Sequence, residues 1–259
     1  MSGPNSPRGR LSERPERYYP SLDGAFDAAI APYRTGSDPI AVLFSGGVDS
    51  VVLAGELRGR GSVELTTTGV AGAPDLLAAS SAAAQLGLPW RGSILSVDDL
   101  EQGRARWTVG LSPMPRSRQS IHLALALAIE HAPAGTILCG QGPDELFLGY
   151  AHFQSLGPDA ATRRATEDLD RLLREDWPRT VDLGRRMGRE VVAPFLDGRF
   201  VRAATEIPIV DRLPDPRPKG LWRDWARHRG VPAELADRPK RALQYGSGVD
   251  RWLRRQAVD

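Results

Sequence analysis

The sequence predicts an α/β protein in which a parallel sheet carries helices on both faces and is followed by a mainly helical C-terminal part. Three observations lead to this class. Up to about residue 150, short apolar runs of strand length alternate with segments of helical periodicity. Beyond residue 149, strand signals become few. With 259 residues and 41% hydrophobic content, the chain can bury a large core.

The chain is expected to have three parts. Residues 1–20 are rich in Pro, Arg, Ser and Gly and are predicted to be a disordered leader. An α/β core is expected over residues 21–150. Residues 151–259 are expected to form a helical part that packs beside the sheet and completes the functional domain.

Within the core, strands and helices are predicted from apolar periodicity and from the residues that begin and end each segment. The strands are expected at residues 40–44, 63–68, 90–95 and 136–139. The helices are expected at residues 21–33, 49–58 and 75–86, from 98 or 99 onward, and at 121–131. Asp75 is expected to cap one of these helices and Gly87 to end it. The stretch 110–118 is expected to be irregular, and residues 113–118 within it are either a mobile lid over the acyl site or a plain surface loop.

Composition excludes several classes of function. The net charge of +2 gives no reason to expect nucleic acid or a membrane surface as a partner. Cys139 is the only cysteine, which excludes an intramolecular disulfide and a Cys/His zinc site and favours a reducing cytoplasm. No signal peptide or membrane span is predicted. Of the 34 basic residues only Lys219 and Lys240 are lysines, which makes both candidates for a special role.

A glycine turn, SGGVDS at residues 45–50, separates the first predicted strand from the helix after it. Glycines let backbone N–H groups approach a phosphate, and a helix N-terminus adds donors and a favourable dipole. Asp49 would oppose a bare phosphate, so we interpret it as a ligand of Mg²⁺ bound to that phosphate. The alternative is an ordinary strand-to-helix turn with Ser and Asp as caps. Neither a GxxxxGK[ST] pattern nor a GxGxxG pattern is present.

A second glycine turn follows the fourth predicted strand, where residues 140–150 read GQGPDELFLGY. In parallel sheets ligands bind beyond the carboxyl ends of the strands, where Ser45 and Gly140 both fall. We therefore interpret Asp144 as joining Asp49 on one Mg²⁺ that bridges the phosphates of ATP. The alternative is that Asp144 and Glu145 are first-turn carboxylates favoured by the helix dipole.

These motifs carry a family resemblance. SGGVDS resembles the pyrophosphate-binding loop of the N-type ATP pyrophosphatases, which cleave ATP to AMP and pyrophosphate. GQGPDELFLGY resembles the pattern G-E-G-x-D-E-L-F-x-G-Y of the asparagine synthetase family. Glu190 with PFLD at 194–197 resembles that family's E-x-R-x-P-F-L-D, and Lys219 and the RPK at 238–240 resemble its K-x-x-L-R and R-x-P-K elements. The resemblance covers residues 39–252 and implies a fold of the adenine nucleotide alpha-hydrolase type.

The resemblance implies ATP-dependent amide synthesis, with ATP as substrate and Mg²⁺ as the metal. A carboxylate, aspartate or an analogue, attacks the α-phosphorus of ATP to give an acyl-adenylate and pyrophosphate, and ammonia or an amine then displaces AMP. The implied metal ligands are Asp49 and Asp144, and the implied catalytic residues are Lys240, Gln141, Asp144 and Glu190. The implied ATP-binding residues are Phe44, Ser45, Gly46, Gly47, Val48, Asp49, Ser50, Val70, Gly140, Gln141 and Lys219.

Three departures from the family pattern bear on the chemistry. The glutaminase domain does not precede the synthetase part, so we expect a stand-alone form that uses free ammonia, ammonia from a separate glutaminase, or another amine. Gln141 replaces the Glu of G-E-G, and an amide orients an amine but is a poor base. Val192 replaces the Arg before P-F-L-D, and the upstream D-R-x-x-M element is degenerate around 181–186, which favours a different carboxylate.

Other interpretations stay open. One is an amide or lactam synthetase of specialised-metabolite biosynthesis, and another is a non-catalytic ATP-binding subunit that regulates a partner. A third is tRNA thiolation or lysidine-type chemistry, which predicts tRNA binding with steep salt dependence. Residues 217–255 hold 11 Arg or Lys against 4 Asp or Glu. We prefer phosphate handling and a solvated helical face to RNA binding there. His122, among Leu and Ala, is expected to be structural.

Overall fold

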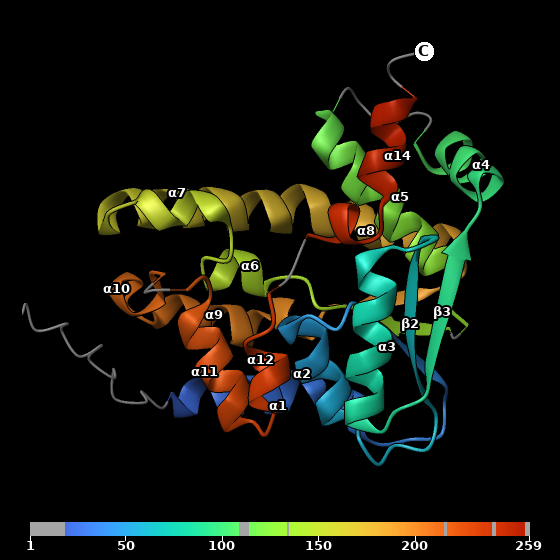
Figure 1. The fold of residues 1–259 in the computed structure, drawn as a ribbon. Coiled ribbons are helices and arrows are strands. Elements are labelled where there is room, and N and C mark those ends of the chain that lie inside the picture. Colours follow the sequence, from blue (N-terminus) through green and yellow to red (C-terminus); the bar gives the residue numbers. More distant parts are fainter. Residues whose placement is uncertain (1–18, 109–113, 134, 215–216, 240–241, 257–259) are drawn as a thin grey trace, which may run out of the picture.

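The computed structural model describes residues 19–108, 114–133, 135–214, 217–239 and 242–256. At its centre lies a five-stranded sheet in the order β3-β2-β1-β4-β5, and every pair of neighbours is parallel (Figure 1). The strands are β1 (Ile40–Leu43), β2 (Val63–Val70), β3 (Trp90–Leu95), β4 (Thr136–Leu138) and β5 (Glu190–Val192). The predicted α/β class with a parallel sheet is confirmed.

The chain changes direction across the sheet between β1 and β4. It runs from β1 outward to β2 and β3, and then returns to β4 on the other side of β1. At such a switch point the loops after two neighbouring strands diverge to opposite faces and leave a crevice beyond their carboxyl ends. Ser45 after β1 and Gly140 after β4 both line the cavity that opens there. The switch point thus positions both predicted glycine turns at one site.

Helices cover both faces of the sheet (Figure 1). One face is covered by α1 (Pro20–Arg34), α2 (Val48–Glu56) and α3 (Pro74–Leu86). The hydrophobic core on this face also contains residues of α9 (Gly198–Glu206), α11 (Gly220–His228) and α12 (Ala233–Ala236). The other face is covered by α4 (Val97–Trp107), α5 (Arg116–Glu130) and α8 (Trp177–Arg186), with α14 (Val249–Arg255) packed on α5. Side chains alternate along β1, so that Ile40 and Val42 enter the first core and Ala41 the second.

The remaining elements are mostly short. They are α6 (Pro143–Leu146), η1 (Ala151–Ser155), α7 (Pro158–Arg171), η2 (Leu172–Asp176), η3 (Pro194–Leu196), α10 (Ile209–Arg212) and α13 (Leu243–Gly246). The segment η2 is π-helical, and α7, η2 and α8 follow one another without a break as one long helix (Figure 1). Single π-helical turns inside α-helices occur frequently at functional sites.

Most predicted elements are confirmed, and four details differ. Helix α5 begins at Arg116 and not near residue 121, so residues 116–118 of the stretch expected to be irregular are helical. The part after residue 150 is mainly helical but contributes β5, which pairs with β4 and extends the sheet; its three residues are too few to give a periodicity signal. The N-cap of α3 is Ala73 and not Asp75, although Gly87 ends the helix as predicted. Ser96 caps α4 and forms a capping box with Asp99. No helix among the described residues is both long and apolar enough to span a membrane.

The predicted division into three parts stays a prediction. Residues 1–18 of the expected leader lie outside the described residues, and α1 already begins at Pro20. The expected boundary at residue 150 separates β4 from β5, two strands that are hydrogen-bonded neighbours in the same sheet. The two parts therefore share one sheet.

Candidate active site

The glycine turn after β1 forms the start of helix α2. Gly46 has a φ of +68°, and a methyl group there would lie 2.8 Å from the carbonyl oxygen of Ala78, so the position requires glycine. The hydroxyl of Ser50 donates to the carbonyl oxygen of Gly47 at 3.0 Å and accepts from the N–H of Ser45 at 3.3 Å. Because the N-cap of α2 is Gly47, no capping side chain covers the N–H groups of the first turn. This is the geometry of an anion site.

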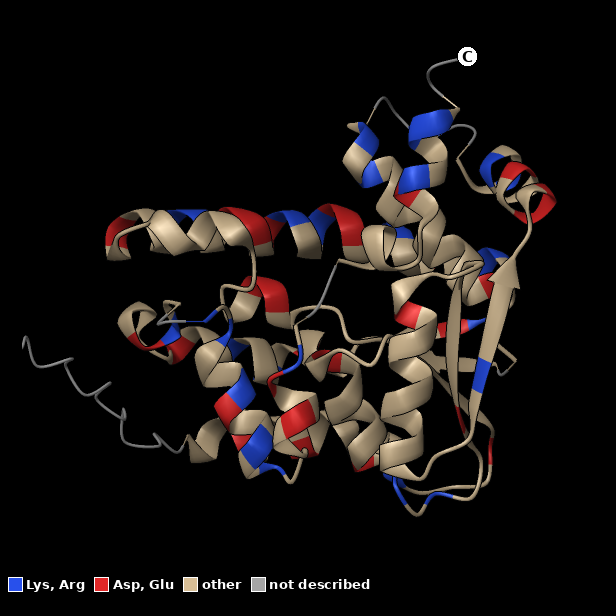
Figure 2. Ribbon diagram, viewed as in Figure 1, with Lys and Arg blue, Asp and Glu red and all other residues tan. Residues whose placement is uncertain are grey.

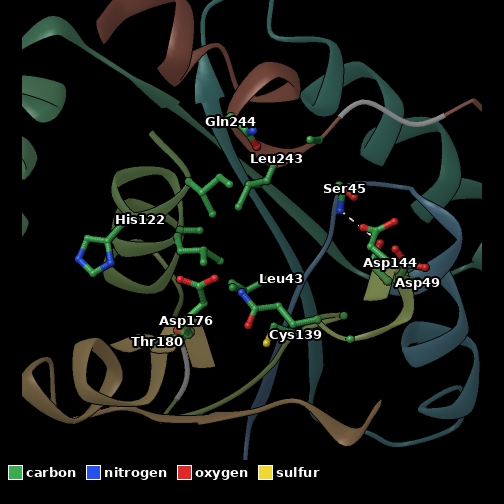
Figure 3. Close-up of a pocket in the computed structure, with 18 of the residues that line it drawn as sticks. Leu43, Ser45, Asp49, His122, Cys139, Asp144, Asp176, Thr180, Leu243 and Gln244 are labelled. Atoms are coloured by element: carbon green, nitrogen blue, oxygen red, sulfur yellow. Dashed lines mark hydrogen bonds between the residues drawn. The ribbon is translucent and has the colours of Figure 1, made fainter. Parts of the chain in front are cut away.

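A buried ion cluster lies where the two glycine turns meet. The Nζ of Lys219 donates to both carboxylate oxygens of Asp49 at 2.9 Å and lies 2.7 Å from the Oδ1 of Asp144. Lys219 is 3% exposed and Asp49 is 2% exposed. Figure 3 shows Asp49 and Asp144 next to Ser45 at the same end of the cavity. One ammonium group therefore bridges carboxylates from the two loops.

Helix α11 places the ammonium group of Lys219. Lys219 is the N-cap of this helix and has a φ of +57°, a left-handed conformation that is uncommon outside glycine. Trp222, three residues later, donates its indole N–H to the Oδ1 of Asp49 at 2.8 Å. The ring of Trp222 also stacks on Phe147, with ring centroids 4.9 Å apart. The packed indole thus joins α11 to the loop that carries Asp49.

The carboxylates suit a magnesium ion that arrives with phosphate. Mg²⁺ prefers hard oxygen ligands and is usually held by one or two carboxylates together with waters and substrate phosphates. Among the residues that the structure describes, no group of three or more His, Cys, Asp or Glu side chains could hold a metal ion. The side chain of Asp144 is 34% exposed and therefore accessible. Because Lys219 bonds both oxygens of Asp49, a metal ion shared by both carboxylates requires this ammonium group to shift.

A cavity of about 270 Å³ extends from these loops along the face of the sheet that α5 covers. Ser45, Asp49 and Asp144 lie at one end, and His122, Asp176 and Thr180 lie at the other (Figure 3). Leu43 at the end of β1 and Cys139 just after β4 lie between the two ends. The cavity therefore extends well beyond the glycine turn after β1, along the sheet to the start of α8.

Two polar side chains from the second glycine turn face unusual surroundings. The Oε1 of Gln141 is buried and has no hydrogen-bond partner within the described ranges. Burial, with the neighbouring charge of Asp144 as a second cause, raises the pKa of Glu145 to about 7. The hydroxyl of Tyr150 donates to this carboxyl group at 2.5 Å. Burial also raises the pKa of the Cys139 thiol to about 12, so the thiol is protonated and unreactive near neutral pH.

The structure brings most of the predicted site residues together. The two loops and the ion cluster contain Ser45, Gly46, Gly47, Val48, Asp49, Ser50, Gly140, Gln141, Asp144 and Lys219. A methyl group at Gly140 would lie 3.1 Å from the Cβ of Asp49, so the loops are in contact. Phe44 lines the cavity. Val70, the last residue of β2, does not line the cavity. Its backbone N–H donates to the carbonyl oxygen of Ser247.

Glu190 lies away from the site, contrary to the expected catalytic role. It is the first residue of β5 and pairs with Thr136, which in turn pairs with Ile40 at the start of β1. Parallel strands keep their amino ends together, so Glu190 lies at the edge of the sheet opposite Ser45. Its carboxylate accepts from the hydroxyl of Thr136 at 3.0 Å. The sequence predicted no strand here, so the motif could not show which end of β5 faces the cavity.

Lys240, the other lysine, falls outside the described residues. Two positions earlier, the guanidinium of Arg238 donates to the carbonyl oxygen of Ala78 at 2.8 Å. A methyl group at Gly46 would lie 2.9 Å from the same guanidinium nitrogen. The RPK element therefore reaches the phosphate-binding turn at Arg238.

Several residues of the site were not predicted. The sequence could have indicated Trp222, because residues three positions apart on a helix lie on the same face, and Trp222 follows Lys219 by three positions. Arg118 and Asp176 pair at 2.5 Å across the far end of the cavity, and Arg179 lines the same end. These three residues lie on separate elements or late in the long helix, and no local pattern in the sequence joins them.

The basic segment 217–255 does not form a continuous basic face in its described part. Arg217 and Arg227 both pair with Asp224 and Asp237. Arg223 donates to the carbonyl oxygen of Pro218 at 3.1 Å. Figure 2 shows basic and acidic residues interspersed along α11. This arrangement supports the preference for a solvated helical face over RNA binding.

The solved structures that align with this chain share little sequence with it. The NMN synthetase from Francisella tularensis aligns at a TM-score of 0.43 with 12% identity, over 91% of this chain and 83% of that chain. The U34-tRNA thiolase from Methanococcus maripaludis aligns at a TM-score of 0.38 with 12% identity, over 96% of this chain and 81% of that chain.

Sequence comparisons identify the family. A putative glutamine-hydrolysing asparagine synthetase of Methanocaldococcus jannaschii is 26% identical in an alignment 271 positions long, which covers 90% of this chain and 50% of that protein. The glutamine-hydrolysing asparagine synthetase of Gallus gallus is 27% identical in an alignment 238 positions long, which covers 85% of this chain and 42% of that protein. The chain thus spans about half the length of the curated relatives it matches. The asparagine synthase family model matches residues 21–189 and 154–259, and the chain belongs to this family.

Proposed function

We propose that this protein is an ATP-dependent amide-forming synthetase that cleaves ATP to AMP and pyrophosphate. A carboxylate is activated as its acyl-adenylate, and ammonia or an amine then displaces AMP. One observation carries the proposal: the phosphate-binding turn after β1 meets Asp144 and Lys219 at the end of a cavity with room beyond the phosphates. Membership of the asparagine synthase family supports it.

The turn at residues 45–50 would bind the pyrophosphate part of ATP. Its backbone N–H groups and the N-terminus of α2 offer donors where negative charge develops on the leaving group. The ammonium of Lys219, already beside both loops, would add a positive charge to the same oxygens. Mg²⁺, held by Asp144 and Asp49, would neutralise charge on the phosphate oxygens. By its position in the family motif, Lys240 would approach the α-phosphate, and Phe44 would contact the adenine.

Gln141 would orient the nitrogen nucleophile. Its Oε1 is a buried acceptor without a hydrogen-bond partner in the described part of the chain, and an N–H group of ammonia or an amine would satisfy it. An amide oxygen accepts a hydrogen bond but takes up no proton near neutral pH. The side chain therefore positions the amine and leaves its deprotonation to another group.

Nucleotide product analysis tests the proposal. Purified protein with Mg-ATP and ammonium should release AMP and pyrophosphate in equal amounts only when a suitable carboxylic acid is present, with aspartate as one acid tried. Asp144→Asn should slow this reaction by about 100-fold, because one of the two carboxylates that would hold Mg²⁺ at the phosphates is lost. Asp159→Asn, in the exposed first turn of α7, is the matched control and should leave the rate unchanged. Release of ADP, or ATP binding without turnover for every acid, would contradict the proposal; the latter would favour the regulatory subunit.

A further inference from the structure

The part of the cavity beyond Gln141 is walled mainly by apolar side chains. Leu43 comes from the sheet, Ile121, Leu125 and Ala128 come from α5, and Leu172 comes from the π-helical turn. Leu125, Ala128 and Leu172 are each no more than 7% exposed, so these walls are sealed from bulk water. A substrate body lying here gains by removing apolar surface from water.

The charged side chains at the far end of this space form ion pairs with one another, although the Nη1 of Arg179 is buried without a hydrogen bond within the described residues. Arg118 bonds Asp176 at 2.5 Å and Glu175 at 2.8 Å, and Arg179 lies 3.6 Å from both acids. The hydroxyl of Thr180 donates to the carbonyl oxygen of Asp176 at 2.9 Å. Two positive and two negative side chains therefore balance, and the end of the cavity carries no net charge from them.

His122 adds no charge to this end. Its Nε2 lies 3.1 Å from the carbonyl oxygen of Trp107, and burial lowers the pKa of the imidazole, which keeps the ring neutral near pH 7. The Nε of Arg118 is buried without a hydrogen bond within the described residues, and it could meet a neutral acceptor such as a carbonyl oxygen. A second carboxylate could accept from the Nε of Arg118, but the charges of Arg118 and Arg179 are already balanced by Glu175 and Asp176, so it would bring an uncompensated negative charge into the cavity. An ammonium group would bring an uncompensated positive charge, and burying either charge is costly.

We infer that the carboxylic acid activated at this site carries an uncharged, mainly apolar body that lies between α5 and the π-helical turn, and that aspartate is not its substrate. The inference rests on the proposed function for the chemistry at the carboxyl group. The observation behind it is independent of that chemistry, since it concerns the walls of the cavity and the balance of charge at its far end.

The π-helical turn η2 shapes this wall. Leu172 begins the turn, Asp176 ends it, and both line the cavity together with Thr180 of α8. The extra residue in the turn changes the angular position of everything after it in the long helix. Leu172, at the start of the turn, lines the apolar part of the cavity. Asp176, at the end of the turn, is oriented so that its carboxylate pairs with Arg118. Leu172 and Ala128 are the residues we expect to set the length of acid that fits.

A chain-length series tests the inference. The wild-type protein is given Mg-ATP, hydroxylamine as the nucleophile, and unbranched monocarboxylic acids from acetate to octanoate, with phenylacetate, aspartate and glutamate in parallel. We expect kcat/KM for AMP release to rise roughly fourfold per added methylene group until the cavity is full. Aspartate should react more slowly than butyrate, which has the same number of carbons and one charge.

Variants then locate the effect. Ala128→Leu fills the cavity and should abolish the increase for the longer acids while acetate keeps its rate. Ser117→Leu adds the same side chain to the exposed face of α5 and should leave the whole series unchanged. A preference for aspartate or glutamate, with no rise along the series, would overturn the inference and leave the proposed function intact. AMP release with none of these acids would overturn both.

Discussion

Replacing Lys219 with Met should destabilise the protein by about 3 kcal/mol, at the lower end of the range for breaking a buried ion pair. Lys219 and Asp49 are 3% and 2% exposed, so the remaining carboxylate stays out of water. The indole of Trp222 still donates to Asp49 at 2.8 Å, which is why we expect the lower end. The Met side chain is about as long as that of Lys, and both residues carry the same backbone cost at a φ of +57°. The difference in unfolding free energy between wild type and Lys219→Met therefore reports the loss of the charge. Urea unfolding with and without Mg²⁺ measures the effect.

Three further measurements serve as controls for this prediction. The double variant Asp49→Asn/Lys219→Met should be less destabilised than the sum of the single variants, because the two residues are in contact. Added Mg²⁺ should restore stability to Lys219→Met, since a cation that binds only the folded state stabilises it. Arg174→Met, at an ion pair whose arginine is 78% exposed, should change stability by less than about 0.5 kcal/mol. Wild-type stability in Lys219→Met, or additivity in the double variant, would refute the buried ion cluster.

Three more predictions concern the same cavity. A methyl group at Gly149 would overlap the Oδ1 of Asp144 and lie 2.5 Å from the Cε of Lys219, so Gly149→Ala should weaken Mg-ATP binding in calorimetry, whereas Gly157→Ala, in open space, should not. The folded pKa of His122 lies below its unfolded value of roughly 6.5 because the ring is buried; its contribution to stability is present above pH 6.5 and is lost as the pH falls through the folded pKa. His122→Gln should therefore flatten the fall in unfolding free energy between pH 7.5 and 5.5, and an unchanged slope would contradict this. Gln141→Glu supplies a carboxylate where the amine is oriented and should raise kcat with ammonium about tenfold; equal rates would argue against that position for the nucleophile.

The sheet and its loops were predictable because their signals are local. The strand β3 spans the predicted residues 90–95, and α3 ends at Gly87 in the left-handed conformation that glycine favours. Asp49 and Asp144 were predicted to meet because each follows a strand of one parallel sheet, and one ammonium group now joins them. The short strand β5 gave no usable period, and with it the position of Glu190 on the sheet was missed.

The far end of the cavity could not be predicted because it depends on contacts between distant residues. Arg118 and Asp176 are 58 positions apart and meet only when the long helix packs against α5. Lys219 was identified by its rarity in an arginine-rich chain, yet the sequence did not show that its ammonium group lies between the two predicted metal ligands. Only the path of α11 across the end of α2 determines that.

The most direct test of the central claim is an isotope transfer from the acid to the nucleotide. A carboxylic acid that supports turnover is labelled with ¹⁸O in its carboxyl group, and AMP from a single turnover is analysed by mass spectrometry. If the acid attacks the α-phosphorus, one labelled oxygen stays with the phosphate when the amine displaces AMP, so the AMP should carry one ¹⁸O. Unlabelled AMP, or label found in phosphate released with ADP, would contradict an acyl-adenylate.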